Sequence, residues 1–165
     1  MSAQMGGLAR RLVSDNLIKE SEAIAALGLA AECNLPFVSQ LVTSSLVDSK
    51  AIAIAAAEEF GVPLLDLDAF DFEHRPDGLV DIKLIRKHNV LPLYRRANRL
   101  FLAVSDPGNI AAFDEIKFHT GINNDVIVVE ESKLAKAIED FANQLEASEG
   151  SIGEEDNIAL DDLDV

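Results

Sequence analysis

Two apolar runs separated by a short polar stretch constrain the fold of this chain more than any other feature. Val90 to Tyr94 and Leu100 to Val104 are apolar, and Arg95 to Arg99 between them is polar. This spacing predicts a β-hairpin, and Asn98 is the turn residue that tolerates a positive φ.

A helix is predicted directly after the hairpin. Asp106 is expected to cap it, with Pro107 at its first position, because proline lacks only an N–H that would be unpaired there. Apolar positions then follow at helical spacing, and Gly121 is placed to end the helix. Strand, turn, strand and helix together predict a compact α+β unit.

Composition indicates a globular chain. Its 165 residues are 48% hydrophobic and 26% charged, enough to bury a core in one domain or two small ones. The apolar stretches are shorter than the roughly 18 residues of a membrane span. Since no basic-then-apolar leader opens the chain, a cytoplasmic location is expected. Cys33 is the only cysteine, which excludes an internal disulfide, and a buried, inert thiol is predicted.

The acidic charge is concentrated at the end of the chain. The net charge is -15, which argues against nucleic-acid binding. Residues 146–165 contain eight acidic residues and no basic one, with scattered Ile158, Leu160 and Leu163. This composition predicts a flexible acidic linker or, alternatively, a partner-binding segment.

A weak internal repeat lies near the start. Residues 12–18 (LVSDNLI) match residues 41–47 (LVTSSLV), and each copy precedes an Ala/Ile-rich helix. The first long helix is predicted over about 21–33 with Ser21 as its cap, and the second over about 49–60 with Gly61 as its C-cap. Residues 1–60 are therefore expected to form a helical subdomain of two helix-turn-helix repeats. The repeat is either simple hairpin packing or a surface for a ligand or partner.

The remaining elements predict a small α/β subdomain over residues 61–145. Residues 62–67 are expected to form a short strand, and Pro63, which cannot donate to a ladder, confines it to a sheet edge or to the start of the strand. Asp81 is expected to cap a helix through His88, residues 125–129 to form a strand, and Ser132 to cap a last helix ending near Leu145. The fold class is α+β, with a three- to four-stranded sheet and packed helices.

No metal or catalytic centre is predicted. His74, His88 and His119 fall on different predicted elements, and the acids at 66, 68 and 71 lack the spacing of a calcium loop. No nucleophile, base and orienting group share a motif. Six basic residues at 83–99 are either a solvated face or a patch for an acidic partner; they are Lys83, Arg86, Lys87, Arg95, Arg96 and Arg99.

Four stretches, in this order and spacing, resemble the amino-terminal domain of type IV pilus extension ATPases of the PilB type. This domain is related to the N-domain of type II secretion ATPases (T2SSE_N, MshEN-like). The stretches are EFGVP at 59–63 with LDL at 65–67, LIRKHNVLPL at 84–93, LFLAVSDP at 100–107 and FHTG at 118–121. The resemblance covers about residues 8–145.

The resemblance implies a regulatory and docking domain joined to a hexameric motor by an acidic flexible linker. Residues 146–165 fit that linker. The chain contains no G-x-x-x-x-G-K-[ST] phosphate loop, so it is not expected to hydrolyse ATP by itself. No cofactor and no direct membrane insertion are expected.

Some members of this family bind cyclic di-GMP through a duplicated motif R-L-G-x-x-L-V-x-x-G-L, and the repeat falls on it. Gly7 and Pro36 stand for the arginine, and Asn16 and Ser45 for the second glycine. Only the apolar skeleton survives, and arginine supplies the stacking and bidentate donors that a nucleotide needs. Arg10 and Arg11 are the candidates to replace it. Direct cyclic-di-GMP binding is therefore the alternative function.

The preferred function is binding of a PilZ-type adaptor, which in relatives joins a FimX-like receptor and so couples pilus extension and twitching motility to cyclic-di-GMP signalling. Interfaces are built on an apolar centre with a polar rim. The expected partner-binding residues lie on the first helix and the turn after it, and they are Leu8, Arg10, Arg11, Leu12, Val13, Leu17 and Ile18.

Overall fold

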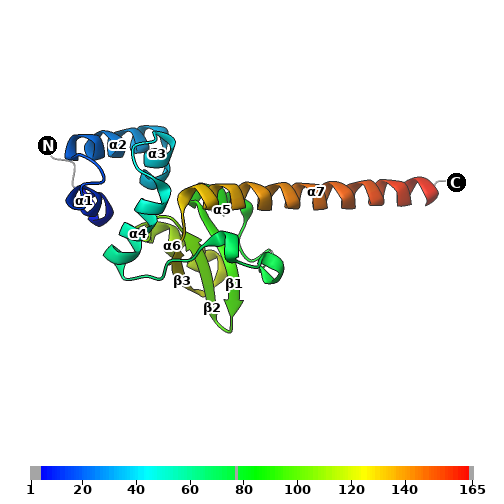
Figure 1. Ribbon diagram of the computed structural model, residues 1–165. Coiled ribbons are helices and arrows are strands. Elements are labelled where there is room, and N and C mark those ends of the chain that lie inside the picture. Colours follow the sequence, from blue (N-terminus) through cyan, green and yellow to red (C-terminus); the bar gives the residue numbers. More distant parts are fainter. Residues whose placement is uncertain (1–4, 77, 164–165) are drawn as a thin grey trace.

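A computed structural model describes residues 5–76 and 78–163 of the chain. Helices α1–α4 form one end of the molecule, a three-stranded sheet with α5 and α6 follows, and α7 runs from the sheet to the far end (Figure 1). The chain is thus α+β, with helices gathered before and around one small sheet. This confirms the predicted fold class.

The four N-terminal helices alternate short and long. They are α1 (Gly7–Ser14), α2 (Glu20–Cys33), α3 (Phe37–Thr43) and α4 (Ser49–Phe60). Gly61 ends α4 at φ 64, as predicted. Ser21, however, is not the cap of α2: Lys19 precedes the helix, and its backbone N–H donates to the Glu22 carboxylate at 3.0 Å. Half of a capping box therefore starts this helix.

The predicted hairpin is present. Strand β1 (Val90–Arg96) pairs antiparallel with β2 (Arg99–Val104), from Val90 opposite Val104 to Arg96 opposite Arg99. The turn residue with positive φ is Ala97, at 53°, and not Asn98. Because Arg96 pairs with Arg99, residues 97 and 98 form a two-residue turn, and such a turn requires a positive φ at its first position.

The third strand lies on the other side of β2. Strand β3 (Asn123–Val128) runs parallel to β2, and the order in the described sheet is β1-β2-β3. A parallel neighbour requires a crossover, which α6 (Ile110–Thr120) supplies. Gly121 ends α6 at φ 69, as predicted. Asn109 precedes the helix, and Asp106 instead accepts from the Gly108 N–H at 2.9 Å, so the predicted Asp106 cap is wrong.

Helix α5 (Ile82–His88) begins where predicted, because the Asp81 carboxylate accepts from the Lys83 N–H at 2.9 Å. Residues 62–67 do not form the predicted strand. They make one parallel bridge, between Leu64 and Val128, and then enter two single-turn helices, η1 (Leu67–Ala69) and η2 (Phe72–His74). The Pro63 ring removes one of the donors that a longer ladder needs.

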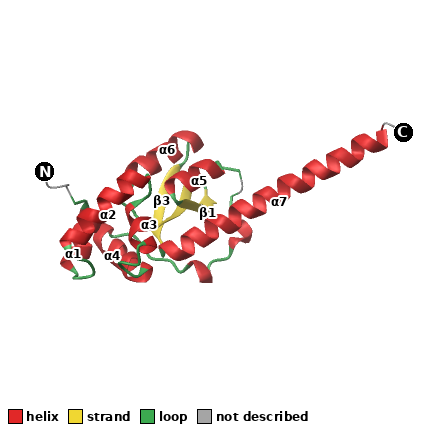
Figure 2. Ribbon diagram, turned by 90° about the horizontal axis from the view of Figure 1, so that it is seen from above, coloured by secondary structure: helices red, strands yellow, loops and turns green. Residues whose placement is uncertain are grey.

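Helix α7 (Glu131–Leu163) is longer than predicted at both ends. It begins at Glu131 and not after Ser132, whose hydroxyl lies 2.9 Å from the Ser49 hydroxyl, and it continues beyond Leu145. Its first half packs on β1 and β2, while α6 lies on the side of the sheet away from it (Figure 2). The second half extends away from the body (Figure 1).

Two apolar clusters form the core. One lies around the sheet, and its largest side chains with no exposed area include Ile85, Leu93 and Leu102. The other lies among α1–α4, around Leu12, Leu41 and Ile52, and it includes Val128 of β3. Strand β3 therefore contributes to both clusters and holds the helical unit against the sheet.

Two surface properties follow from the fold. Cys33 is exposed at the end of α2, so the predicted buried thiol is wrong. Within the described residues, no single helix is long and apolar enough to span a bilayer. Helices α2 and α3 together reach that length and composition but are bent by 109°.

Candidate functional site

The sequence repeat is a repeat in structure. In the first copy, Asn16, two residues after the end of α1, has a φ of 59, and in the second copy Ser45, two residues after the end of α3, has a φ of 56. The Leu17 N–H donates to the Leu12 carbonyl at 3.0 Å, and the Leu46 N–H donates to the Leu41 carbonyl at 3.2 Å. These are the bonds of a Schellman motif, which a left-handed residue makes possible. Both copies thus end the short helix in the same way.

The left-handed positions are those at which the cyclic-di-GMP motif has its second glycine. Asn16 and Ser45 adopt the backbone that glycine would adopt freely, so the turn survives without it. The arginine positions differ more. Gly7 and Pro36 lack any side-chain donor for a phosphate or a guanine. The unit has kept the scaffold of the motif and lost its polar contacts.

The predicted partner-binding residues divide by exposure. Leu8, Leu12 and Ile18 are buried in the helical cluster, and Leu12 has no exposed area. Val13 is half-buried, whereas Arg10 and Leu17 are exposed. Leu17 is 37% exposed, and its counterpart in the second copy, Leu46, is 39% exposed. The outer surface of the first copy is therefore formed by Arg10, Val13 and Leu17.

Arg11 is held by acidic neighbours. Its Nε lies 2.9 Å from the Asp15 carboxylate, and its terminal nitrogens lie 2.7 Å from Glu58 and 3.7 Å from Glu59 on α4. The hydrogen bond to Asp15, followed by its charge, raises the pKa of Arg11. Since these pairs tie α1 to α4, a ligand would have to displace them to use this guanidinium.

A second polar centre lies where the helical unit meets the sheet. The Glu131 carboxylate, only 6% exposed, accepts from the Ser39 hydroxyl at 2.8 Å and from Asn89 Nδ2 at 2.7 Å. Asn89 ends α5 with a φ of 54, and its Nδ2 lies 3.5 Å from the Ser105 hydroxyl. One buried carboxylate thus connects α3, α5, the end of β2 and α7. No sequence pattern pointed to this network, because its members are far apart in the chain.

A cavity of about 290 Å³ lies beside this network. Pro36 and Phe37 of the second repeat line it, together with His88 and the loop after β2. Asp106 of that loop is half-buried, and this burial raises the pKa of its carboxyl group although the Gly108 N–H opposes the shift. The cavity lies between the helical unit and the sheet, and its walls are partly apolar and partly polar.

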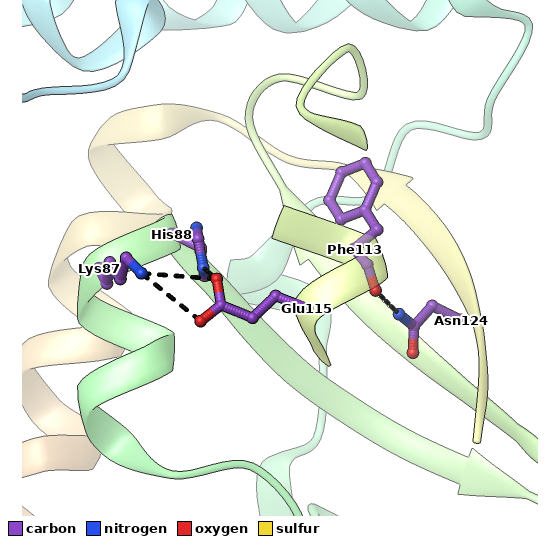
Figure 3. Close-up of polar contacts among 5 residues, drawn as sticks. All are labelled: Lys87, His88, Phe113, Glu115 and Asn124. Carbon is purple, nitrogen blue, oxygen red and sulfur yellow. Dashed lines mark hydrogen bonds and ion pairs between the residues drawn. The ribbon is translucent and has the colours of Figure 1, made fainter. Parts of the chain in front are cut away.

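Figure 3 shows the contacts that hold α5 and α6 together. His88 Nε2 lies 2.5 Å from the Glu115 carboxylate, and Lys87 Nζ lies 3.5 Å from it. The hydrogen bond from His88 and the charge of Lys87 lower the pKa of Glu115. On the neighbouring strand, Asn124 Nδ2 donates to the Phe113 carbonyl at 2.7 Å. These contacts position α5, α6 and β3 relative to one another.

The other polar candidates have structural partners. Lys133 Nζ lies 2.8 Å from Asp66 and 3.0 Å from Asp68, and its hydrogen bond lowers the pKa of Asp66. Among the described residues, no group of three or more His, Cys, Asp or Glu side chains is placed to hold a metal ion. The six basic residues do not form one patch: three lie on α5, and three lie at the far end of the hairpin (Figure 1).

Comparison with known proteins identifies the family of this chain. The family model of the MshEN domain matches residues 60–148. The chain is 40% identical over 164 residues to the type IV pilus assembly ATPase PilB of Pseudomonas aeruginosa, covering 99% of this chain and 28% of that protein. It is 33% identical over 135 residues to PilB of Acinetobacter baylyi, covering 82% of this chain and 23% of that protein. The chain thus spans less than a third of these relatives.

Two solved structures share the fold. The N-terminal domain of XpsE superposes with a TM-score of 0.66 at 21% identity, covering 81% of this chain and 92% of that one. The structure of MshE with cdg, cyclic di-GMP, superposes with a TM-score of 0.58 at 18% identity, covering 82% and 98%.

Together these findings define an α+β domain of the kind that lies in the N-terminal region of secretion and pilus ATPases. The chain belongs to the MshEN domain family. It is homologous to the N-terminal region of PilB and type II secretion ATPases, as the sequence resemblance predicted.

Proposed function

We propose that this chain is the regulatory and docking domain of a type IV pilus assembly ATPase, and that it binds a PilZ-type adaptor. The adaptor would connect the domain to a FimX-like receptor and so couple pilus extension and twitching to cyclic-di-GMP signalling. The proposal includes a cytoplasmic location, a hexameric ATPase motor as the other partner, and no ATPase activity, nucleic-acid binding or membrane insertion of the domain itself. The similarity to PilB supports this assignment.

One observation carries the adaptor proposal. The duplicated unit resembles a nucleotide-binding motif in its two turns, but its surface offers exposed Leu17 and exposed Arg10, while Gly7 and Pro36 supply no side-chain donor for a phosphate or a guanine. A small apolar centre with a basic rim suits a protein partner better than a dianionic nucleotide. Leu8, Leu12 and Ile18 would support this surface from the core, and Val13 and Arg11 would lie at its edge.

The test is titration of a PilZ-type adaptor into surface variants of the full chain, followed by calorimetry. Leu17→Asp is expected to weaken binding about tenfold or more, because it places a charge in the buried centre of the interface. Leu46→Asp is the matched control, since Leu46 holds the same position and exposure in the second copy. Equal affinity of Leu17→Asp and the unmodified chain would contradict the placement on the first copy.

The second candidate is direct binding of cyclic di-GMP. The observation that favours it is that the two turns have the same left-handed backbone conformation, at Asn16 and Ser45, together with the fold shared with MshE. Calorimetry with cyclic di-GMP separates the candidates. Saturable binding at micromolar concentration, lost in Arg10→Glu, would replace the adaptor proposal by a nucleotide sensor.

The proposed organisation has three parts. Residues 1–60 would carry regulation, residues 61–145 would form the scaffold, and residues 146–165 would join the scaffold to a motor. Limited proteolysis of the full chain tests this division, because cleavage is expected first in the acidic joining segment, whose composition is that of a linker. Initial cleavage between residues 61 and 145 would contradict it.

A further inference from the structure

An apolar groove of about 540 Å³ runs along the free edge of the sheet. Strand β3 forms its floor, and α6 and the segment Val62–Pro63 form its walls. Its apolar lining includes half-buried Phe101, Phe113 and Val126. Within the described sheet, β3 pairs with β2 and otherwise makes only the single bridge to Leu64. An open groove with aromatic walls is a typical site for an inserted apolar side chain.

The arginine-bearing end of the hairpin adjoins this groove. Arg99 lines the groove, Arg96 lies directly opposite Arg99 in the ladder, and Arg95 precedes them. All three are exposed, at the end of the hairpin farthest from α7 (Figure 1). Arg99 lies 3.4 Å from Asp125, and Arg95 Nε donates to the Ala97 carbonyl at 3.1 Å.

This arrangement is unfavourable for the hairpin itself. Like charges directly opposite each other in an antiparallel pair destabilise it, and the turn requires a positive φ at Ala97, which has a Cβ. Arg96 and Arg99 lie opposite each other at this end of the hairpin, Arg95 is next to them in the chain, and Asp125 is the one carboxylate that lines the groove. The excess positive charge at this end of the hairpin therefore favours binding of acidic side chains, and the apolar lining of the groove beside it favours binding of apolar side chains.

The chain itself contains a segment of matching chemistry. Residues 154–165 (EEDNIALDDLDV) place six acidic residues around Ile158, Leu160 and Leu163. Helix α7 carries residues 154–163 of this segment away from the sheet (Figure 1). Its 33 residues correspond to a length of about 50 Å. The part of the segment that lies on α7 is therefore far from the groove of its own molecule (Figure 1).

We propose that the β3 groove and the hairpin arginines bind residues 154–165 of a second copy of this chain. The apolar side chains of that segment enter the groove, and its carboxylates pair with Arg95, Arg96 and Arg99. The contact is heterologous, because groove and segment are different surfaces, so it links copies in a ring or a row. Nucleic acid does not fit the same site, since the chain has a net charge of -15 and the groove itself holds Asp125. This inference does not depend on adaptor or nucleotide binding by the helical unit.

Fluorescence anisotropy with a labelled peptide of residues 154–165 and the dilute full chain tests the contact. The measurement is made at about 0.15 M salt, where a Debye length of about 8 Å confines charge effects to nearby groups. Saturable binding is expected, and Arg95→Glu with Arg96→Glu and Arg99→Glu should weaken it about tenfold or more. Lys83→Glu with Arg86→Glu and Lys87→Glu is the matched control, because it changes the net charge equally on α5; it should leave the affinity within about twofold.

A second peptide separates groove binding from charge attraction. Serine at positions 158, 160 and 163 keeps every carboxylate and removes the apolar side chains, and this peptide is expected to bind about tenfold more weakly. Sedimentation velocity of the full chain should show self-association that the hairpin variant loses. Absence of saturable peptide binding, equal affinity of the hairpin variant, or equal affinity of the serine peptide would overturn the proposal.

Discussion

Asp106 has the sequence context of a helix N-cap but forms a hydrogen bond within a loop instead. The Asp-Pro-Gly-Asn stretch reads as a helix start, yet α6 begins four residues later and the Asp106 carboxylate accepts from the Gly108 N–H within the loop. An added Cβ on Gly108 would lie 3.1 Å from Asp106 Oδ1 and from the Phe60 ring. The loop is therefore closed around Asp106 by tertiary packing and not by helix capping.

Burial of Asp106 predicts a pH-dependent effect. Because burial raises the pKa of this carboxyl in the folded chain, its contribution to stability is complete below the unfolded pKa of about 3.9 and is lost as pH rises through the folded pKa. Asp106→Asn keeps an acceptor for Gly108 and cannot ionise. We expect the variant to be more stable than the unmodified chain at pH 7 and equal to it near pH 3, in urea unfolding at both pH values.

Asp71 offers the control, because it accepts from the Glu73 N–H at 2.9 Å in the same two-residue pattern but is exposed. A gain at pH 7 as large in Asp71→Asn as in Asp106→Asn would show that burial is not the cause.

At the scale of elements, the two copies of the helical unit share one backbone and differ in the residue that ends the short helix. Asn16 tolerates the left-handed region because its side chain is short and polar, whereas serine does so less readily. The sequence alignment of the copies predicted equivalent positions, and the equivalent Schellman bonds confirm them.

This difference predicts unequal responses to glycine. Ser45→Gly is expected to raise the free energy of unfolding by about 1 kcal/mol, because glycine adopts a positive φ without a Cβ penalty. Asn16→Gly is its matched counterpart and should change stability by less than about 0.5 kcal/mol. Urea unfolding of both variants checks the order, and a larger gain from Asn16→Gly would contradict it.

At the scale of the whole molecule, the helical unit and the sheet are connected by β3 and by a buried polar contact. Val128 has no exposed area and packs on the helical cluster, while Glu131 accepts hydrogen bonds from Ser39 of α3 and Asn89 at the end of α5. Separating the helical unit from the sheet would break the Ser39–Glu131 hydrogen bond and expose Val128 to water, and both changes cost free energy. The helical unit and the sheet are therefore expected to unfold together.

Two spectroscopic probes test this coupling. Tyr94 is the only tyrosine, and with no tryptophan present its fluorescence reports on the sheet, whereas far-ultraviolet circular dichroism is dominated by the helices. Coincident urea transitions are expected. Val128→Ala should lower the free energy of unfolding obtained from each probe by about 2 kcal/mol. A helical transition that precedes the Tyr94 transition, or that alone responds to Val128→Ala, would show that the parts are independent.

The sequence by itself determined the local architecture, because it depends on neighbours in the chain. Apolar periodicity predicted the hairpin and α4, glycine predicted the ends of α4 and α6, and Asp81 predicted the start of α5. Leu8 and Leu12 were correctly placed on one helical face, but periodicity does not say whether such a face meets a core or a partner. Only the packing of α1 against α4 decided that these leucines are interior and that Leu17 is exposed. The Glu131 network, the β3 groove and the separation of the basic residues were likewise decided by tertiary structure, because their members come together only when distant elements pack.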